Sequence, residues 1–207
     1  METHLRKIGR PLSFDRNVAL RAAMLTFWRH GYETTSIADL TKAMGISPPS
    51  LYTAFGDKRQ LFLEAVELYA GDATERERAI SGAQSAFVAA SDLLHAVAIT
   101  YTGDETPLGC LLASATATGS TDSLEVRRKV ADIRLGLAAQ FSARIKQDIA
   151  DGLLPPDCNA EALANLVVAV TQGMSVLARD GGSRGQLLAV ARAAMMAWPS
   201  RDLDCGR

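Results

Sequence analysis

Residues 45–58 concentrate polar side chains where a protein core has no use for them. Ser47 is a good N-cap, and Pro48 follows at the first helical position, where its missing N–H costs nothing. The short helix that starts there carries hydroxyl and phenol groups at Ser50, Tyr52 and Thr53. Such groups donate hydrogen bonds to phosphate oxygens and to base edges. The segment therefore predicts a helix that lies in a DNA groove.

Catalytic and metal-binding patterns are not found. The histidines His4, His30 and His95 are far apart, and the sequence contains no HExxH, GxSxG, phosphate loop or paired-carboxylate pattern. The cysteines, at Cys110, Cys158 and Cys205, form neither a CxxC motif nor an even disulfide set. We interpret them as reduced and structural, with a redox or ligand role as the alternative. We expect no enzyme activity, no metal and no cofactor.

Three helices are predicted around this segment, at residues 13–30, 37–44 and 48–55, from the spacing of their apolar residues. Gly31 and Gly45 are placed to end the first two, and Ser36, with Asp39 three residues later, to begin the second. Two short helices joined by a glycine-containing turn form a helix-turn-helix, whose second helix enters the major groove. Any small helical hairpin of an all-α protein gives the same pattern. The predicted core contacts are Ile46, Leu51 and Phe55 against Val18, Phe27, Ile37 and Leu40.

Residues 10–70 resemble the N-terminal signature of the tetracycline-repressor (TetR) family. The matching segments are Gly31-Tyr32, Thr34-Thr35-Ser36-Ile37, Gly45-Ile46-Ser47, Ser50-Leu51-Tyr52-x-x-Phe55 and Asp57-Lys58-x-x-Leu61-Phe62. Two departures are a threonine at Thr41, where alanine is usual, and the pair Pro48-Pro49, where the family often has small residues. Pro49 removes a possible backbone donor near the DNA.

The resemblance implies DNA-contacting roles for individual residues. Phosphate contacts are implied for Thr35, Ser36, Ser47, Tyr52 and Lys58, where a phenol, an ammonium and helix N-termini suit an anion. Base contacts are implied for Pro49, Ser50 and Thr53, none of which can make the bidentate contacts of Arg, Asn or Gln. We therefore expect modest direct readout. Arg6, Lys7 and Arg10 form an arm suited to the minor groove, or a disordered tail.

Charge is divided unevenly along the 207 residues. Residues 1–60 contain nine Lys or Arg against five Asp or Glu, whereas the remainder contains thirteen against eighteen. A basic first module on an acidic body suits a protein whose first part alone faces phosphates. By itself, a bias of this size also arises by chance.

The fold class predicted is all-α, with an N-terminal helix-turn-helix domain of three helices and a C-terminal helical bundle. Residues 1–57 would form the arm and the DNA-binding domain, a helix over 58–79 would connect, and residues 80–207 would form the ligand-binding and dimerisation domain. Apolar spacing predicts the clearest body helix from Val126 to Ile149, and others over 87–101, 159–178 and 187–198. Asp57 is expected to cap the connecting helix, with Leu61, Phe62, Ala65, Leu68 and Tyr69 on one face.

The helix over 159–178 is apolar nearly all round, so it must be covered on more than one side. With the helix over 187–198 it is expected to form a four-helix dimer interface, as the family usually does; a monomer with an apolar core is the alternative. The interface candidates are Leu163, Leu166, Val170, Leu177, Leu187, Ala191, Met195 and Trp198. A two-fold dimer predicts a palindromic operator.

A small-molecule effector, of unknown identity, is what the family resemblance implies for the body. Small and soft residues could line its pocket, although each is also compatible with a core position: Tyr101, Cys110, Leu111, Thr116, Phe141, Met174 and Trp198. These residues include no basic cluster of the kind that would indicate a phosphorylated or strongly acidic ligand.

The resulting hypothesis is a ligand-releasable repressor that acts as a homodimer on double-stranded operator DNA. The alternatives are an activator of the same fold, and a helical enzyme or a non-DNA interaction module. Uncharged stretches stay shorter than a membrane span, and residues 1–11 lead into no apolar segment, so we expect no membrane contact and a cytoplasmic location.

Overall fold

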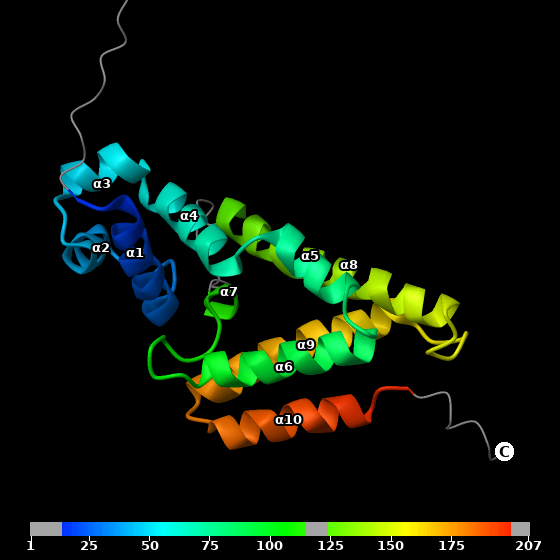
Figure 1. Ribbon diagram of the computed structural model, residues 1–207. Helices are drawn as coiled ribbons and strands as arrows, with labels where there is room; N and C mark the ends of the chain where they lie inside the picture. Colours follow the sequence, from blue (N-terminus) through cyan, green and yellow to red (C-terminus); the bar gives the residue numbers. More distant parts are fainter. Residues whose placement is uncertain (1–13, 115–123, 200–207) are drawn as a thin grey trace, which may run out of the picture.

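The computed structural model describes residues 14–114 and 124–199. Ten helices and no strand lie in these two ranges, which confirms the all-α class (Figure 1). The end that the sequence predicts to bind DNA, called the DNA-binding end below, contains α1 (Arg16–His30), α2 (Ile37–Met44) and α3 (Pro48–Phe55). The body contains α4 (Lys58–Ala70), α5 (Ala73–Ser81), α6 (Ala86–Tyr101), α7 (Leu111–Ser114), α8 (Leu124–Ala150), α9 (Ala160–Arg179) and α10 (Arg184–Met196).

Side-chain caps begin the short helices where the sequence predicts. Ser36 starts α2 with a capping box that includes Asp39, and Ser47 starts α3 by accepting a hydrogen bond from the Ser50 N–H. Asp57 caps α4. Gly45, at φ 65° in the left-handed region, then ends α2 and allows the tight turn into α3.

The core of the DNA-binding end is aromatic. The ring of Phe62 packs edge-on against Phe27 and against Tyr32, with 4.9 Å between the ring centroids in each pair. Leu51 and Phe55 are buried as predicted, but the prediction for Val18 is wrong because its side chain is 66% exposed. Asp15 starts α1 later than expected, and the inward face of the helix passes through Ala19, Leu20, Ala23, Met24 and Phe27 instead.

The predicted connecting helix over 58–79 is broken in two. Gly71 ends α4 at φ 66°, and the Asp72 side chain starts α5 by accepting from the Thr74 N–H at 2.7 Å. The prediction of one continuous helix is therefore wrong, because the Asp72 cap begins a second helix within that range. Leu68, expected on the buried face of α4, is exposed, and Val66 is buried in its place.

The body is layered, with α4, α5 and α8 along one side, α6 and α9 in the middle, and α10 packed against α6 (Figure 1). α9 is the one described helix whose length and composition would allow a membrane crossing. It contacts α6, α8 and α10.

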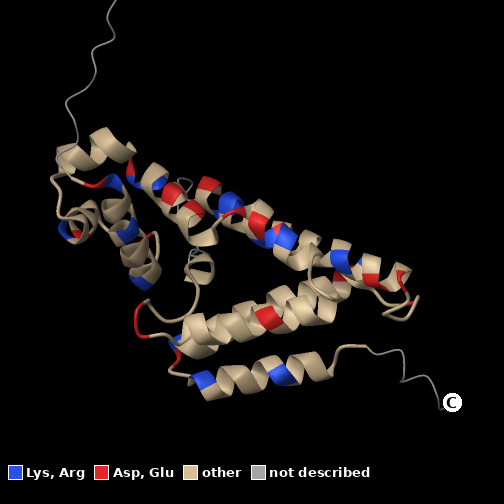
Figure 2. Ribbon diagram, in the orientation of Figure 1, with Lys and Arg blue, Asp and Glu red and all other residues tan. Residues whose placement is uncertain are grey.

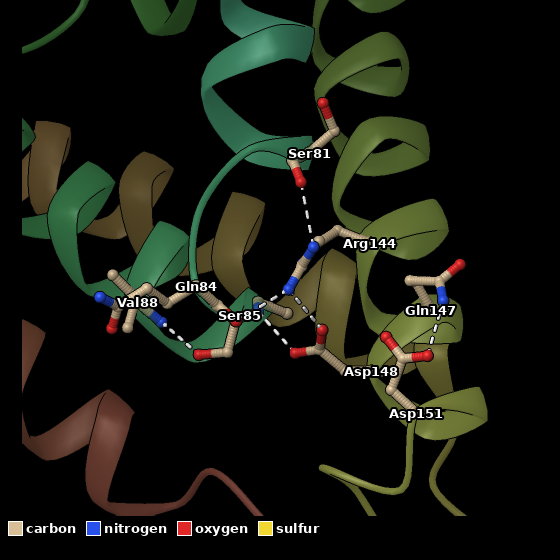
Figure 3. A network of polar contacts seen from close by, with 9 residues as sticks. Ser81, Gln84, Ser85, Val88, Arg144, Gln147, Asp148 and Asp151 are labelled. Atoms are coloured by element: carbon tan, nitrogen blue, oxygen red, sulfur yellow. Dashed lines mark hydrogen bonds and ion pairs between the residues drawn. The ribbon is translucent and has the colours of Figure 1, made fainter.

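A buried ion pair fastens the α5–α6 turn to α8 (Figure 3). Asp148, 1% exposed, accepts the Ala86 N–H at 2.6 Å and pairs with Arg144 at 2.9 Å. Arg144 in turn donates to the backbone oxygens of Ser81 and Gln84, each at 3.0 Å. One arginine and one aspartate thus fix three backbone groups of the turn to α8.

Candidate nucleic-acid interface and effector cavity

α3 is held against α1 and α4 by Arg16. Its guanidinium donates to the Ala54 oxygen at 3.2 Å and to the Glu64 carboxylate at 2.7 Å, and it lies 4.4 Å from the centre of the Phe55 ring. Leu51 and Phe55 face inward beneath it. These contacts fix the rotation of α3 about its own axis. They therefore also determine which residues of α3 face outward.

The outer side of α3 presents uncharged groups (Figure 2). Pro49, Tyr52 and Thr53 are exposed and Ser50 is half-buried, so the residues implied for base and phosphate contacts share one surface. The hydroxyls already have local partners, because Thr53 Oγ1 donates to the Pro49 oxygen at 2.8 Å and the Ser47 and Ser50 Oγ atoms lie 2.9 Å apart. Each hydroxyl can still accept a hydrogen bond from a base.

The N-terminus of α3 has lost its usual backbone donors. Pro48 and Pro49 have no N–H, the Ser50 N–H is used by the Ser47 cap, and the Leu51 N–H bonds to the Ser47 oxygen at 3.0 Å. The free N–H groups expected beside Ser47 are therefore absent from this first turn. A phosphate here would have to use the Ser47 hydroxyl.

The start of α2 separates the two residues implied there for phosphate contact. Thr35 is 1% exposed, and its hydroxyl donates to the Gly31 oxygen at 2.6 Å, so its side chain does not face solvent. Ser36 is exposed and bonds to Asp39, whose pKa is lowered by the hydrogen bonds from the Ser36 side chain and backbone. Of this pair, Ser36 is the residue at the surface.

Lys58 is half-buried at the junction of α4 with the turn after α1. Its ammonium donates to the Glu33 oxygen at 3.3 Å and lies 4.7 Å from the centre of the Tyr32 ring. Burial lowers its pKa, against the opposing effect of Glu33. Lys58 thus supports the fold as well as offering a cation, while the arm residues Arg6, Lys7 and Arg10 lie outside the described residues.

A cavity of about 300 Å³ lies within the body, between α4, α5, α6, α7, α8 and α9. Tyr101 and Cys110, two of the predicted pocket residues, line it. Tyr69 lines it as well and donates from its hydroxyl to Cys110 Sγ at 3.2 Å. Burial, followed by the neighbouring Cys110, raises the pKa of both tyrosines, so their hydroxyls remain protonated donors.

Other predicted pocket residues are part of the solid core. Leu111, Phe141 and Met174 are fully buried and do not line the cavity, Trp198 is buried beside Phe87, and Thr116 lies outside the described residues. The predicted pocket residues include no basic group, whereas the lining of the cavity includes two. Arg76 and Arg134 line the cavity, from α5 and α8.

One loop connects this cavity to the DNA-binding end. Trp28, near the end of α1, donates from its indole Nε1 to the Gly109 oxygen at 3.1 Å, and its ring packs edge-on against Tyr69 with 4.8 Å between centroids. Arg179 of α9 donates to the Trp28 oxygen at 3.1 Å. Cys110 is fixed to α9 through its N–H and Ser175 Oγ at 2.8 Å.

Gly109 is the residue that makes this junction possible. Its φ is 75°, and a Cβ would lie 2.8 Å from the Ser175 backbone oxygen and from Ser175 Oγ. Any larger residue would therefore separate the loop from α9.

An apolar face is exposed on α9 and α10. Leu166, Gly173 and Val176 follow helical spacing along α9, and Ala193 and Met196 along α10. The predicted interface residues divide over this surface and the interior: Leu166 and Leu177 are exposed, Leu163, Val170 and Met195 are half-buried against the core, and Leu187, Ala191 and Trp198 are buried within the chain.

Two family models match the chain. One, described as "Bacterial regulatory proteins, tetR family", matches residues 19–65, and one, described as "Tetracyclin repressor-like, C-terminal domain", matches residues 92–195. The chain belongs to the TetR family. It is therefore a DNA-binding transcriptional regulator with the domain order that the sequence predicted.

Curated relatives are similar along most of their length. The HTH-type transcriptional repressor ComR of Escherichia coli K12 is 34% identical over 193 residues, which is 92% of each chain. The HTH-type transcriptional repressor BdcR of the same organism is 27% identical over 88% of each chain. Among solved structures, a cysteine mutant of the TetR-family regulator CifR, complexed with 26-base-pair double-strand operator DNA, is 43% identical with a TM-score of 0.86. That match covers 92% of this chain and all of CifR.

The residues missed by the sequence reading lie where distant segments meet. Tyr69 was expected on an apolar helix face and Trp28 lies within the predicted helix over 13–30, but their polar ends reach Cys110 and Gly109 across the fold. Arg179 gave no signal beyond its position at the end of an apolar helix. The signal in the sequence was an apolar stripe that ends in a tyrosine or an arginine, because the polar groups of such residues form hydrogen bonds when they are buried.

Proposed function

We propose that this regulator is a homodimeric repressor that binds a palindromic operator and is released by a small molecule bound in the body. The observation that carries the proposal is the outer face of α3, which presents uncharged polar side chains on a helix that Arg16 holds in place. CifR, bound to operator DNA in its solved structure, supports the same use of α3 here. ComR and BdcR, both named repressors, support repression rather than activation.

Phosphate contacts would come from Ser36, Ser47, Tyr52 and Lys58, and base contacts from Pro49, Ser50 and Thr53. The basic arm of Arg6, Lys7 and Arg10 would add contacts in the minor groove. Because none of the base-facing residues is bidentate, sequence preference would depend strongly on DNA shape. The exposed α9–α10 face would hold the second subunit, and two α3 helices would then lie about one DNA turn apart, ~34 Å.

The effector would bind in the cavity beside Tyr101 and Cys110. The hollow between α6 and α10 is larger, at about 700 Å³, but it adjoins Met196, which is 86% exposed. The cavity beside Tyr101 is preferred because Tyr69 and Cys110 in its lining adjoin Trp28 and the Gly109 loop. A ligand there would displace Tyr69 or the 109–110 loop, and both contact Trp28 of the DNA-binding end.

The decisive experiment selects bound sequences from a random DNA pool with the full-length protein. A palindromic consensus, bound by one dimer with a steep loss of affinity as salt rises, is the expected result. No binding at low salt, or a consensus without two-fold symmetry, would contradict the proposal. Regulation occurs where the DNA lies, so the proposed location is the cytoplasm, and no catalytic role is proposed.

A further inference from the structure

Charge in the effector cavity is one-sided. Arg76 and Arg134 line it, and no Asp or Glu does. Two other hollows are balanced: Asp92 accompanies Arg192 between α6 and α10, and Glu161 accompanies Lys146 between α8 and α9. Unlike these two, the effector cavity has basic groups in its lining and no acidic ones.

Arg134 is half-buried and, within residues 14–114 and 124–199, has no hydrogen bond or ion pair. Arg76 is held in place by bonds to the Ala70 oxygen at 2.9 Å and to Gln140 Oε1 at 3.2 Å, neither of which is a carboxylate. A guanidinium beside an apolar wall favours an anion, because a carboxylate can accept two of its N–H groups at once.

The rest of the lining limits what the anion can be. Leu93, Val97, Ile133 and Leu137 supply apolar wall, and Thr171 and Gln172 add polar groups from α9. At about 300 Å³ the cavity is at the small end of ligand sites. Two cations also fall short of the charge that a polyphosphate would require.

We propose that the effector is a small organic carboxylate with a compact apolar body, bound through Arg134 and Arg76. This inference rests on the proposed function, which places the effector in this cavity. Arg134 of α8 and Arg76 of α5 would draw together around the carboxylate. The apolar body would lie toward Tyr101 and Tyr69, and so toward the loop that touches Trp28.

The test uses three probes of one shape: benzoate, benzyl alcohol and benzylamine. Calorimetry with the full-length protein, without DNA, is expected to give benzoate affinity at least about tenfold above that of the other two. Arg134→Gln should lower benzoate affinity about tenfold and leave that of benzyl alcohol within about twofold. Equal binding of the three, a preference for benzylamine, or no benzoate binding at millimolar concentration would overturn the proposal.

Arg192→Gln is the matched control, since it removes the same charge from the α6–α10 hollow. A loss of benzoate binding in Arg192→Gln, but not in Arg134→Gln, would move the site there and also overturn the proposal. Operator binding without any probe is measured in parallel. A protein that binds operator DNA but not benzoate retains the proposed function, whereas one that binds benzoate through Arg134 but no DNA retains the site alone.

Discussion

Arg179 Nη2 lies 3.1 Å from the backbone oxygen of Trp28, so the end of α9 is bonded directly to the end of α1 across 151 positions of sequence. The same guanidinium reaches the Cys110 oxygen at 3.4 Å. The Arg179 side chain thus joins three parts of the protein: the apolar face of α9 and α10, the 109–110 loop beside the cavity, and α1, which supports α3. A shift of the loop at Cys110 has a short route to the DNA-binding end.

Arg179→Met should reduce the effect of a ligand without removing DNA binding. The variant keeps the aliphatic stem but loses both donors, so operator affinity in the absence of ligand is expected to change less than about threefold. The factor by which an effector weakens binding, typically about 5 to 150, should fall toward one. Fluorescence anisotropy with labelled operator, with and without effector, measures that factor.

Arg184→Met is its control. Arg184 forms similar bonds, to Thr102 Oγ1 at 3.3 Å and to the Thr102 oxygen at 3.5 Å, but these join α10 to the end of α6. Its ligand response should match that of the unchanged protein. An equal loss in both variants would mean that Arg179 acts through general stability.

Asp148→Ala should destabilise the body strongly. It leaves Arg144 without its ion pair and the Ala86 N–H without an acceptor in a buried position (Figure 3). The free energy of unfolding should fall by about 3 kcal/mol, measured by urea denaturation. Asp151→Ala, which removes an exposed carboxylate bonded to Gln147, should cost less than about 0.5 kcal/mol. Similar losses would show that the pair contributes little.

Gly173→Leu should block dimerisation while leaving the subunit folded. A Cβ at Gly173 meets no atom within 4 Å in the subunit, and the residue lies on the exposed face of α9 with Leu166 and Val176. A leucine there fits the monomer and improves helix propensity, but it would keep a second subunit from close approach. Light scattering should give a dimer for the unchanged protein and a monomer for the variant, with the helical circular dichroism signal kept.

Gly136→Leu provides the matched control, because a Cβ at Gly136 of α8 also meets no atom within 4 Å. It should remain dimeric. A dimeric Gly173→Leu variant would place the interface elsewhere.

Element positions could be predicted from the sequence because each short helix carries its own signals. Ser36, Ser47 and Asp57 cap their helices as expected, and Leu51 and Phe55 turn inward. The failures occurred where two local preferences compete. Gly71 followed by the cap of Asp72 stopped a helix that apolar spacing alone continued.

The proposed effector cavity was predicted less well, because its lining comes from six helices. Tyr101 and Cys110 were found, but Arg76 and Arg134 looked like ordinary exposed residues of charged helices. Likewise, Leu187 and Ala191 fit an interface stripe, yet α6 covers that side of α10. Periodicity identifies an apolar face but not which neighbour covers it.

Acid should weaken the start of α2. Hydrogen bonds from Ser36 hold the pKa of Asp39 below its ordinary value of 3.8, so the folded state binds its proton less readily than the unfolded state. Its stabilising contribution is complete above 3.8 and is lost as pH falls through the lower folded value. The stability difference between the unchanged protein and Asp39→Asn should therefore shrink between about pH 5 and pH 2 in urea denaturation.

Asp104→Asn removes an exposed charge from the loop after α6 and serves as the control. An Asp39→Asn difference that grows in acid would contradict the assignment.

Lys58→Ala and Thr53→Ala should affect DNA binding in different ways. In the proposed interface Lys58 contacts phosphates, so its loss should weaken binding to every sequence and reduce the slope of log affinity against log salt by about one. The proposed role of Thr53 is to contact base edges, so its loss should change the selected consensus while leaving nonspecific affinity within about twofold. Arg59→Ala, which removes the neighbouring cation already paired with Glu125 at 2.8 Å, should change neither strongly.

Because the Lys58 ammonium also bonds to the Glu33 oxygen, its loss has a second possible effect, on the turn before α2. Lys58→Met keeps apolar contact with Tyr32 but, like Lys58→Ala, loses both the charge and the bond to the Glu33 oxygen, so its free energy of unfolding, measured beside its DNA binding, separates the two effects. If the phosphate role holds, Lys58→Met loses the same salt slope as Lys58→Ala while remaining as stable as the unchanged protein. If Lys58→Met binds DNA normally, the cation serves the fold, and Tyr52 and Ser47 must supply the phosphate contacts on this side of α3.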